Sequence, residues 1–484
     1  MSPTQNDSAE PAAPQPFRTS LASRLTLLSV ASALFMQAID STALSTALPT
    51  LARAFSTDPI HLKLCLTAYI MALAVFVPAS AWAADRFGAR RVFMAAMGIF
   101  LLGSVLCGQS RNLEQLVAFR ILQGAGGAMM APVGRVMVVA SHPREQLVKA
   151  MVWMTTPGLL GPILGPPLSG FILSIADWPW IFYINVPVGI LGMLAVWRFV
   201  PKIVQPHPGR FDTLGYLMAA AAICAAMVGA ESVGVNLLPG WGQALVWTFA
   251  IGMGWTYVRY AGKRERPVLD LKLLKIATYR ANQTGGTLMR LTVGAFPFLL
   301  PLLLQSGLGW TPLQAGLLTM SIAVGSMSAR LGAQFVLRRF GFRKTLMFTA
   351  AACGLVISTT GLFRSNTPIA WMVVVLAVGG FLRSNHLTCA GTLAFADIPD
   401  TSVSQASSLS SVLQQVAQAL GITIAALTLR LSQVIGAAHG LAPMAPQNFV
   451  LPFAVIGFAC LSATAIYGAL PADAGAHMQG RRRR

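Results

Sequence analysis

The succession of long apolar stretches is the feature that most constrains what this chain can fold into. A helix needs about 20 apolar residues to cross a hydrocarbon core of roughly 30 Å. Stretches of that kind have the approximate limits 25–48, 62–84, 92–110, 114–140, 150–172, 181–200, 212–233, 243–260, 284–306, 313–337, 345–363, 369–395, 406–430 and 449–470. The sequence therefore predicts an all-α polytopic membrane protein with about fourteen transmembrane helices. Twelve is the competing count if the tight pair 212–233 and 243–260 is only peripheral.

The composition excludes an ordinary soluble domain. Apolar residues make up 55% of the 484 positions and charged residues only 10%, whereas soluble domains carry about 25% charge. Disorder requires low hydrophobicity, so it is excluded as well. The net charge of +20 leaves two classes, a nucleic-acid binder with a large core or a membrane protein, and the mean hydropathy of +0.65 favours the second.

The distribution of basic residues predicts the orientation. An even number of spans places both termini on one side of the membrane. If the N-terminus is inside, the inner segments hold 25 Lys and Arg and the outer segments five, with the other five inside spans. Such an excess follows the positive-inside rule, so we expect cytoplasmic N and C termini. The positive charge is thus an orientation signal, the lipid bilayer is the expected partner, and nucleic acid is not.

A short internal repeat predicts a doubled architecture. The sequence R-F-G-x-basic-basic occurs at 86–91 and again 253 positions later, in a corresponding inner loop of each half. The predicted domains are a disordered tail 1–24, a six-helix bundle 25–200, an inserted helix pair with a cytoplasmic loop 201–283, a second six-helix bundle 284–470 and a basic tail 471–484. Transporters are often built from such repeats, with the substrate site near the midplane between them. Chance recurrence of short basic turns is the alternative.

The first copy of the repeat contains a candidate conformational latch. Gly88 permits a tight turn between antiparallel helices. Asp85 stands next to Arg86 and close to Arg90, which predicts an ion-pair cluster. That cluster would hold the two halves together on the inner side and break when they rock.

Asp40 is the one acidic residue well inside the first six spans, and a carboxylate in a bilayer must pair, face water or be protonated. At about 1.5 Å per residue, Asp40 and Arg120 both lie some 9–12 Å below the outer surface. We therefore expect them to pair, with Gln37 and Gln123 one turn away on the same helix faces. Burial disfavours an ionised carboxylate and a guanidinium favours it, so a motion that separates the pair would change its proton affinity. A static ion pair is the alternative.

The second half of the chain carries cations in its predicted spans without clear acidic partners. These are Arg290, Arg330, Arg383 and His386, with Asn385 as a polar neighbour. Unpaired intramembrane cations indicate a water-filled, electropositive cavity and an anionic substrate. Arg330 is close enough to the inner end to snorkel. The predicted substrate-cavity residues are Gln37, Gln123, Arg290, Arg383, Asn385 and His386.

Five segments, in order along the chain, resemble the signatures of the 14-helix drug:proton antiporters of the major facilitator superfamily. They are 40–49 (DSTALSTALP, similar to LDxTIVNxALP), 84–91 (ADRFGARR), 120–127 (RILQGAGG), 158–170 (GLLGPILGPPLSG) and 178–189 (WPWIFYINVPVG). The resemblance covers about 25–470 and weakens after residue 300. The chain departs from the family pattern at Ala81, usually Gly, at Ser45, usually Asn, and at Pro166 and Pro167, usually two glycines.

The resemblance implies a major facilitator fold and a proton-coupled exporter of hydrophobic drugs or toxic organic compounds. Export would proceed across the bacterial inner membrane by alternating access, with proton transfer carried by the segments that contain Asp40 and Arg120. The antiporter motif would comprise Gly158, Gly161, Pro162 and Gly165, and the spacing of its glycines places small residues on one helix face for close packing.

Two alternatives remain open. One is export of an organic anion or metabolite, and the other is a membrane sensor or scaffold, for which the longest inner loop, about 261–283, is short. The sequence contains no metal-ligand cluster, nucleotide-binding glycine loop or nucleophile elbow, so we expect no enzyme activity, cofactor or metal. The expected partners are protons and a small-molecule substrate, and a periplasmic adaptor is left undetermined. The six isolated cysteines are interpreted as small buried hydrophobic residues.

Overall fold

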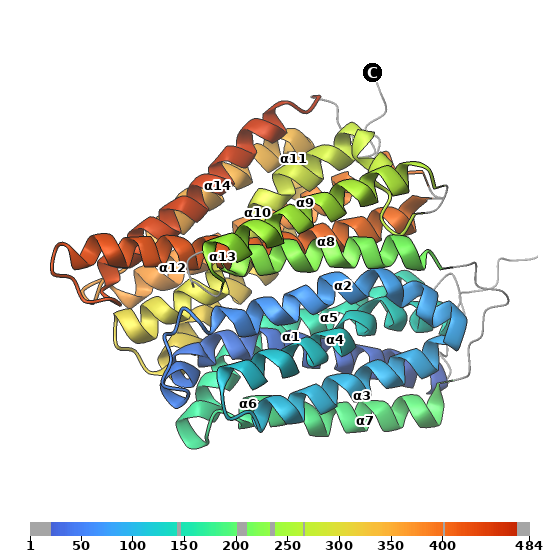
Figure 1. The fold of residues 1–484 in the computed structure, drawn as a ribbon, viewed down its shortest axis with the longest axis horizontal. Helices are drawn as coiled ribbons and strands as arrows, with labels where there is room; N and C mark the ends of the chain where they lie inside the picture. Colours follow the sequence, from blue (N-terminus) through green and yellow to red (C-terminus); the bar gives the residue numbers. More distant parts are fainter. Residues whose placement is uncertain are drawn as a thin grey trace, which may run out of the picture.

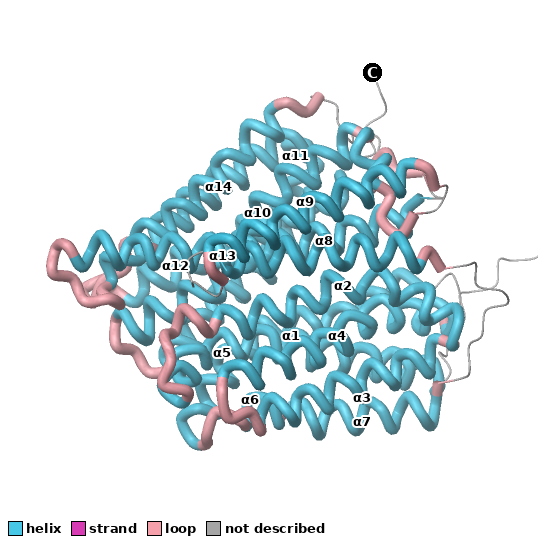
Figure 2. The backbone as a smooth tube through the Cα atoms, viewed as in Figure 1, coloured by secondary structure: helices cyan, strands magenta, loops and turns pink. Residues whose placement is uncertain are grey.

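The structure is a computed structural model that describes residues 21–142, 147–200, 211–232, 238–264, 267–399 and 402–471. Within these ranges the chain is helical and forms no strand, as Figure 2 shows. The predicted all-α class is therefore confirmed. The tails predicted at the two ends lie almost entirely outside the described residues.

The N-terminal half forms one bundle of six predicted spans. Its helices are α1 (Leu21–Ala54), α2 (Lys63–Phe87), α3 (Ala89–Gly108), α4 (Leu113–Ser141), α5 (Leu147–Ile175), α6 (Trp180–Tyr183) and α7 (Asn185–Phe199). The short α6 and α7 together make the sixth span, Trp180–Phe199. Helix α1 packs against α4, α5 and α7, and α4 packs against α2 and α3.

The C-terminal half forms a second bundle of six spans on five α-helices. These are α10 (Ala277–Pro301), continued by the π-helical η3 (Leu302–Gly307), α11 (Pro312–Thr360), α12 (Ile369–Ala394), α13 (Val403–Ala437) and α14 (Val450–Gly468). The predicted spans 313–337 and 345–363 are two arms of α11 that meet at a kink at Gly341. The inserted pair, α8 (Thr213–Ser232) and α9 (Gly240–Gly262), packs together, and α8 contacts both α2 and α13.

The internal repeat is present in the backbone as well as in the sequence. Gly88, between α2 and α3, has a φ of 89°, and Gly341, between the two arms of α11, has a φ of 77°. Positive φ values of this size favour glycine, because it lacks a Cβ. The two halves therefore turn at corresponding positions, each through a glycine with a positive φ.

All fourteen predicted spans are helical, and eleven described helices are long and apolar enough to cross a membrane. The other three predicted spans are α5, α9 and the first arm of α11. Helix α9 is rich in Gly, Trp and Tyr, which lowers its hydropathy. In α5 and in the first arm of α11, some side chains lie outside the described residues. The remaining apolar part of α5, Leu160–Ile175, is too short to meet the length of a span. The chain is a multi-pass membrane protein.

The two bundles lie side by side and touch at the end that the sequence predicts to be outside (Figure 1). Gln305 of η3 donates from Nε2 to the backbone oxygen of Thr46 in α1 at 2.8 Å. At the same end, a Cβ added to Gly170 of α5 would lie 2.6 Å from the backbone oxygen of Pro312 in α11. The apolar core is also continuous here, because one cluster joins Leu48 of α1 to the C-terminal bundle. The structure is therefore closed at its outer end.

Candidate proton-coupling site and substrate cavity

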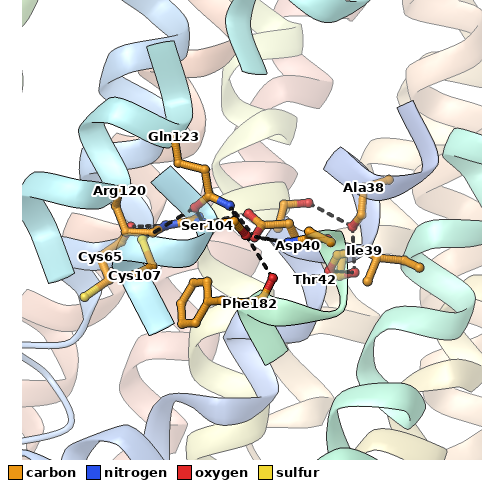
Figure 3. Close-up of polar contacts among 12 residues, drawn as sticks. Ala38, Ile39, Asp40, Thr42, Cys65, Ser104, Cys107, Arg120, Gln123 and Phe182 are labelled. Atoms are coloured by element: carbon orange, nitrogen blue, oxygen red, sulfur yellow. Dashed lines mark hydrogen bonds and ion pairs between the residues drawn. The ribbon is translucent and has the colours of Figure 1, made fainter. Parts of the chain in front are cut away.

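The Asp40 carboxylate lies in the middle of the N-terminal bundle, where it is 1% exposed. Its Oδ2 accepts a hydrogen bond from Arg120 Nη1 at 2.6 Å, so the two predicted partners form an ion pair. Its Oδ1 accepts hydrogen bonds from Gln123 Nε2 at 2.7 Å and from Asn185 Nδ2 at 3.0 Å. Three donors on α4 and α7 thus converge on one carboxylate of α1 (Figure 3).

The Arg120 guanidinium is fully buried and has contacts beyond Asp40. Its Nη1 also donates to Gln123 Oε1 at 2.6 Å, and its Nε donates to the backbone oxygen of Cys65 at 3.3 Å. Its Cζ lies 4.2 Å from the centre of the Tyr69 ring, a cation–π distance. Because Cys65 and Tyr69 belong to α2, the arginine connects a third helix to the ion pair.

Ser104 of α3 completes the polar network. Its hydroxyl accepts from Gln123 Nε2 at 3.2 Å and from Asn185 Nδ2 at 3.0 Å. It donates to the backbone oxygen of Phe182 at 3.0 Å. One network around Asp40 therefore includes residues of α1, α2, α3, α4, α6 and α7.

The antiporter motif on α5 packs against the part of α1 that carries Asp40. A side chain on Gly161 would collide with Ala38, and one on Gly165 would collide with Thr42. Thr42 Oγ1 also donates to the backbone oxygen of Gly161 at 3.3 Å. Pro162 of the motif is exposed and lies apart from this contact, and Gly158 falls in a part of α5 whose side chains are outside the described structure.

The predicted ion-pair cluster of the inner loop is not formed in this conformation. The ion pairs found among the described residues are Arg120–Asp40 and Lys63–Glu231, so Asp85 has no such partner there. Arg90 is turned toward the end of α7 and donates from Nη2 to the backbone oxygen of Trp197, while Arg86 is exposed. The role of Asp85, Arg86, Gly88 and Arg90 as a latch stays a prediction.

The residues predicted to line a substrate cavity are divided between the two bundles, and among them Arg290 and His386 are near each other. Gln37 lies beside the Tyr69 hydroxyl. Arg383 is half-buried and borders a small void together with Phe296 and Cys353.

His386 is a satisfied polar group. Its Nδ1 lies 2.9 Å from Thr349 Oγ1, and its Nε2 lies 3.2 Å from Tyr467 Oη. Its neighbour Asn385 donates from Nδ2 to the backbone oxygen of Phe381 at 3.2 Å.

Arg290 differs from the other candidates. It lies in the middle of α10, is 8% exposed, and forms no hydrogen bond or ion pair with the described part of the chain.

A second buried ion pair was not predicted from the sequence, where Lys63 is one of the five basic residues counted in the outer segments. The structure buries Lys63 completely and places its Nζ 3.2 Å from Glu231 Oε2. Thr423 of the C-terminal bundle donates to Glu231 Oε1 at 2.7 Å. Glu231 on α8 therefore connects α2 to α13. The only signal for this ion pair in the sequence was that each residue is a single charge at the edge of an apolar stretch.

Asn185 and Ser104 were also missed as site residues. Asn185 stands in the segment 178–189, whose resemblance to a family signature was itself the available signal. Ser104 is a single hydroxyl in an apolar helix and had no signal in the sequence.

Two helical bundles around buried charges define a polytopic protein of the transporter class. Residues 30–422 match the family model of the Major Facilitator Superfamily. The chain belongs to this superfamily of transporters.

Relatives with high similarity bear the name multidrug resistance protein MdtD. The one from Pectobacterium carotovorum is 37% identical over 404 residues, which cover 83% of this chain and 86% of the relative. The one from Escherichia coli O157:H7 is 38% identical over 408 residues, covering 83% and 85%.

Solved structures of transporters share the fold at low sequence identity. The POT family transporter PepTSo has a TM-score of 0.71 at 12% identity, with 96% of this chain and 99% of that chain covered. A D-xylose-proton symporter has a TM-score of 0.64 at 14% identity, with 94% and 98% covered.

Proposed function

We propose that this protein is a proton-coupled secondary active exporter, an antiporter of hydrophobic drugs or toxic organic compounds. It would work by alternating access in the bacterial inner membrane. Membership of a transporter superfamily and relatives named for multidrug resistance support this proposal. The observation that carries it is the ion pair of Asp40 with Arg120, because both side chains are almost completely buried.

Protonation of Asp40 would change the energetics of the whole network. Removing one charge of a buried pair costs about 3–5 kcal/mol, because the other charge is left uncompensated. Arg120 would retain only its neutral acceptors, Gln123 Oε1 and the backbone oxygen of Cys65. Proton binding therefore favours a different placement of α4 relative to α1, and proton release restores the paired state.

Helix α5 provides a physical route from this network to the interface between the bundles. Its Gly161 and Gly165 pack directly against α1 at Ala38 and Thr42, two residues before and two residues after Asp40. Its outer part, around Gly170, packs against Pro312 of α11. A movement of α1 at Asp40 would displace α5 and alter the contact that closes the outer end.

The test is proton release from proteoliposomes that contain the purified protein. We expect a hydrophobic dye such as ethidium, added outside, to enter in exchange for protons that leave, so that the lumen becomes more alkaline. We also expect an imposed pH gradient to drive dye transport. Dye transport that is insensitive to the gradient, with no dye-induced proton movement, would overturn proton coupling.

A second candidate function is export of an organic anion or metabolite. The specific observation in its favour is Arg290, a buried cation in the C-terminal bundle without a partner among the described residues. The same proteoliposome assay, challenged with organic anions instead of dyes, distinguishes the two substrate classes. A non-transporting sensor or scaffold would show no flux with either.

A further inference from the structure

Arg290 forms no ion pair with any acidic residue in the described part of the chain. The sequence contains no Asp or Glu between Asp270 and Asp397, and none from 401 to 472. The one buried acid of the N-terminal bundle's interior, Asp40, is already paired with Arg120. An uncompensated buried charge costs several kcal/mol, so a cation retained at such a place indicates a negative partner that is not part of the chain.

Arg290 lies at the membrane depth at which transporters with two repeats bind their substrates. It is near the middle of α10, a helix of 25 residues that crosses the bundle. Helix α10 contacts α1 of the N-terminal bundle as well as α12, α13 and α14 of its own. Transporters with two repeats bind their substrates near the bilayer midplane, at the interface of the repeats.

The surroundings of Arg290 form a small polar cradle on one face of α10. Asn282, Gly286 and Arg290 are spaced by four residues, so they share that face. A Cβ added to Gly286 would lie 3.2 Å from Arg290 Nη1 and 3.3 Å from Asn282 Oδ1. Neither Arg290 Nη1 nor the two amide atoms of Asn282, which is 1% exposed, has a hydrogen-bond partner in the described structure. The absence of a side chain at Gly286 leaves these two polar groups facing one point.

Aromatic rings border the cradle. Tyr467 of α14 packs against Gly285, with its ring 2.7 Å from a Cβ added there. Tyr279 and Tyr467 are both close enough to Arg290 to interact with it electrostatically. His386 is also near, and its ring is held by Thr349 and Tyr467.

We propose that Asn282, Gly286 and Arg290 bind the carboxylate of an amphipathic organic monoanion, whose aromatic or apolar part contacts the tyrosine rings. A planar guanidinium binds a carboxylate with two parallel hydrogen bonds. The Asn282 amide presents its Oδ1 to the cradle in this structure and supplies the Nδ2 donor once the amide group rotates by half a turn. One guanidinium is neutralised by one negative charge, whereas a phosphate dianion would leave a buried charge uncompensated. The description of this anion as a transported substrate rests on the proposed function, but its binding does not.

The experiment measures binding of four matched naphthalene compounds to the purified full-length protein in detergent. They are 2-naphthoate, 2-naphthamide, 2-naphthyl phosphate and 2-naphthylmethylammonium, which differ in the charge of one group. We expect 2-naphthoate to bind at least tenfold more tightly than the amide, and more tightly than the phosphate and the ammonium compound.

Two substitutions test the cradle itself. Gly286→Ala keeps the charge of Arg290 and fills the space between it and Asn282, so we expect naphthoate affinity to fall at least tenfold. Its melting temperature should not fall, because alanine is the better helix former. Arg290→Gln should abolish the preference for naphthoate over the amide, and Arg290→Lys should retain part of it. Arg364→Gln, a matched charge change in the outer loop 361–368, should bind as the wild type does.

Equal affinities for naphthoate and its amide would overturn the proposal. Naphthoate binding that is unchanged in both Gly286→Ala and Arg290→Gln would overturn it too, because the anion would then bind elsewhere. The binding assay needs no pH gradient, so it separates this proposal from the proposed function. Gradient-driven dye export without naphthoate binding contradicts only the carboxylate site, and naphthoate binding without gradient-driven transport contradicts only proton-coupled export.

Discussion

At the scale of single residues, Asp40 is held by donors from two neighbouring helices. Arg120, Gln123 and Asn185 all donate to its two oxygens. A buried acceptor that loses its donor costs about 1–3 kcal/mol. Each donor therefore contributes to holding α4 and α7 against α1, and removing one of them should weaken both the fold and the candidate coupling site.

Asn185→Leu removes one donor to Asp40 without removing a charge. The carboxylate loses the hydrogen bond that connects it to α7, so we expect slower gradient-driven export in proteoliposomes. Unfolding should also become easier by about 1–3 kcal/mol, because Ser104 loses the same donor.

Asn366→Ala, a substitution of an exposed asparagine in an outer loop, serves as the control and should leave the export rate unchanged. An export rate that is the same in Asn185→Leu and in the wild type would show that this hydrogen bond does not contribute to the coupling site.

The sequence was sufficient to predict the contact of Asp40 with Arg120 but not the rest of the network. The rise per residue gives the depth of a side chain in the membrane, and both residues are at the same depth. Depth does not give the rotation of a helix about its axis. Because of that rotation, Gln123 reaches the carboxylate, whereas Gln37 lies beside Tyr69.

At the scale of helices, α5 is confined between α1 and α11. Its glycines allow the backbones of α1 and α5 to approach more closely than any side chain would permit. The four-residue spacing of the motif therefore has a packing function that the structure shows directly. Its contribution to transport is testable through the same contact.

Gly161→Ala would place a methyl group against Ala38 and push α5 away from the Asp40 helix. Overpacking of this kind costs about 1–3 kcal/mol, so we expect a lower melting temperature together with slower export. Ala38→Gly in the same protein should restore part of both, because it removes the nearest atom but leaves the backbone carbon of Ala38 at 2.8 Å.

Gly254→Ala in α9, where an added Cβ meets nothing within 4 Å, is the matched control and should be neutral or stabilising. If Ala38→Gly fails to rescue Gly161→Ala, the close contact of α1 and α5 is not the cause of the defect.

The inserted helix pair is anchored by the ion pair of Lys63 with Glu231. Lys63→Met alone leaves a buried carboxylate uncompensated, and we expect a loss of about 3–5 kcal/mol in the free energy of unfolding. The double variant Lys63→Met with Glu231→Met should recover much of this loss. Thermal melts of the two single variants and the double variant measure the coupling, and additive losses would contradict a mutual pair.

Helix positions could be predicted from the sequence because each span needs a fixed length of apolar residues. The continuity of α11 across Gly341 could not be predicted in this way. A short basic segment between two apolar stretches looks the same in the sequence whether one helix continues with a kink or a second helix begins. The burial of Lys63 was missed for a related reason. A charge at the edge of an apolar run is assigned to the loop unless its partner, here Glu231, is known.

At the scale of the whole molecule, the structure is closed at its outer end by contacts between the bundles. They join α5 to α11, α1 to η3, and α8 to α13. Outside the contact of Gln305 with Thr46, a pocket of about 640 Å³ lies between Pro49, Arg53 and Trp310. Figure 1 shows α14 tilting away from the N-terminal bundle toward the opposite, inner end. Alternating access requires the outer contacts to separate during transport.

A side chain at Gly170 should therefore disturb transport. Its Cβ would lie 2.6 Å from the backbone oxygen of Pro312 and 2.7 Å from Leu313 Cα, so the outer contact could not close as it does in this structure. We expect Gly170→Ala to slow export, while Gly391→Ala in α12, where an added Cβ meets nothing within 4 Å, should export as the wild type does. Export by Gly170→Ala at the wild-type rate would contradict a role of this contact in transport.

The most direct test of the account is Asp40→Asn, which removes the charge and the proton site at almost constant volume. Substrate uptake into proteoliposomes should be measured in two ways, driven by a pH gradient and as exchange of labelled for unlabelled substrate without a gradient. We predict that Asp40→Asn loses gradient-driven transport and proton movement but keeps exchange. Gradient-driven transport equal to that of the wild type would contradict the role of Asp40 in coupling.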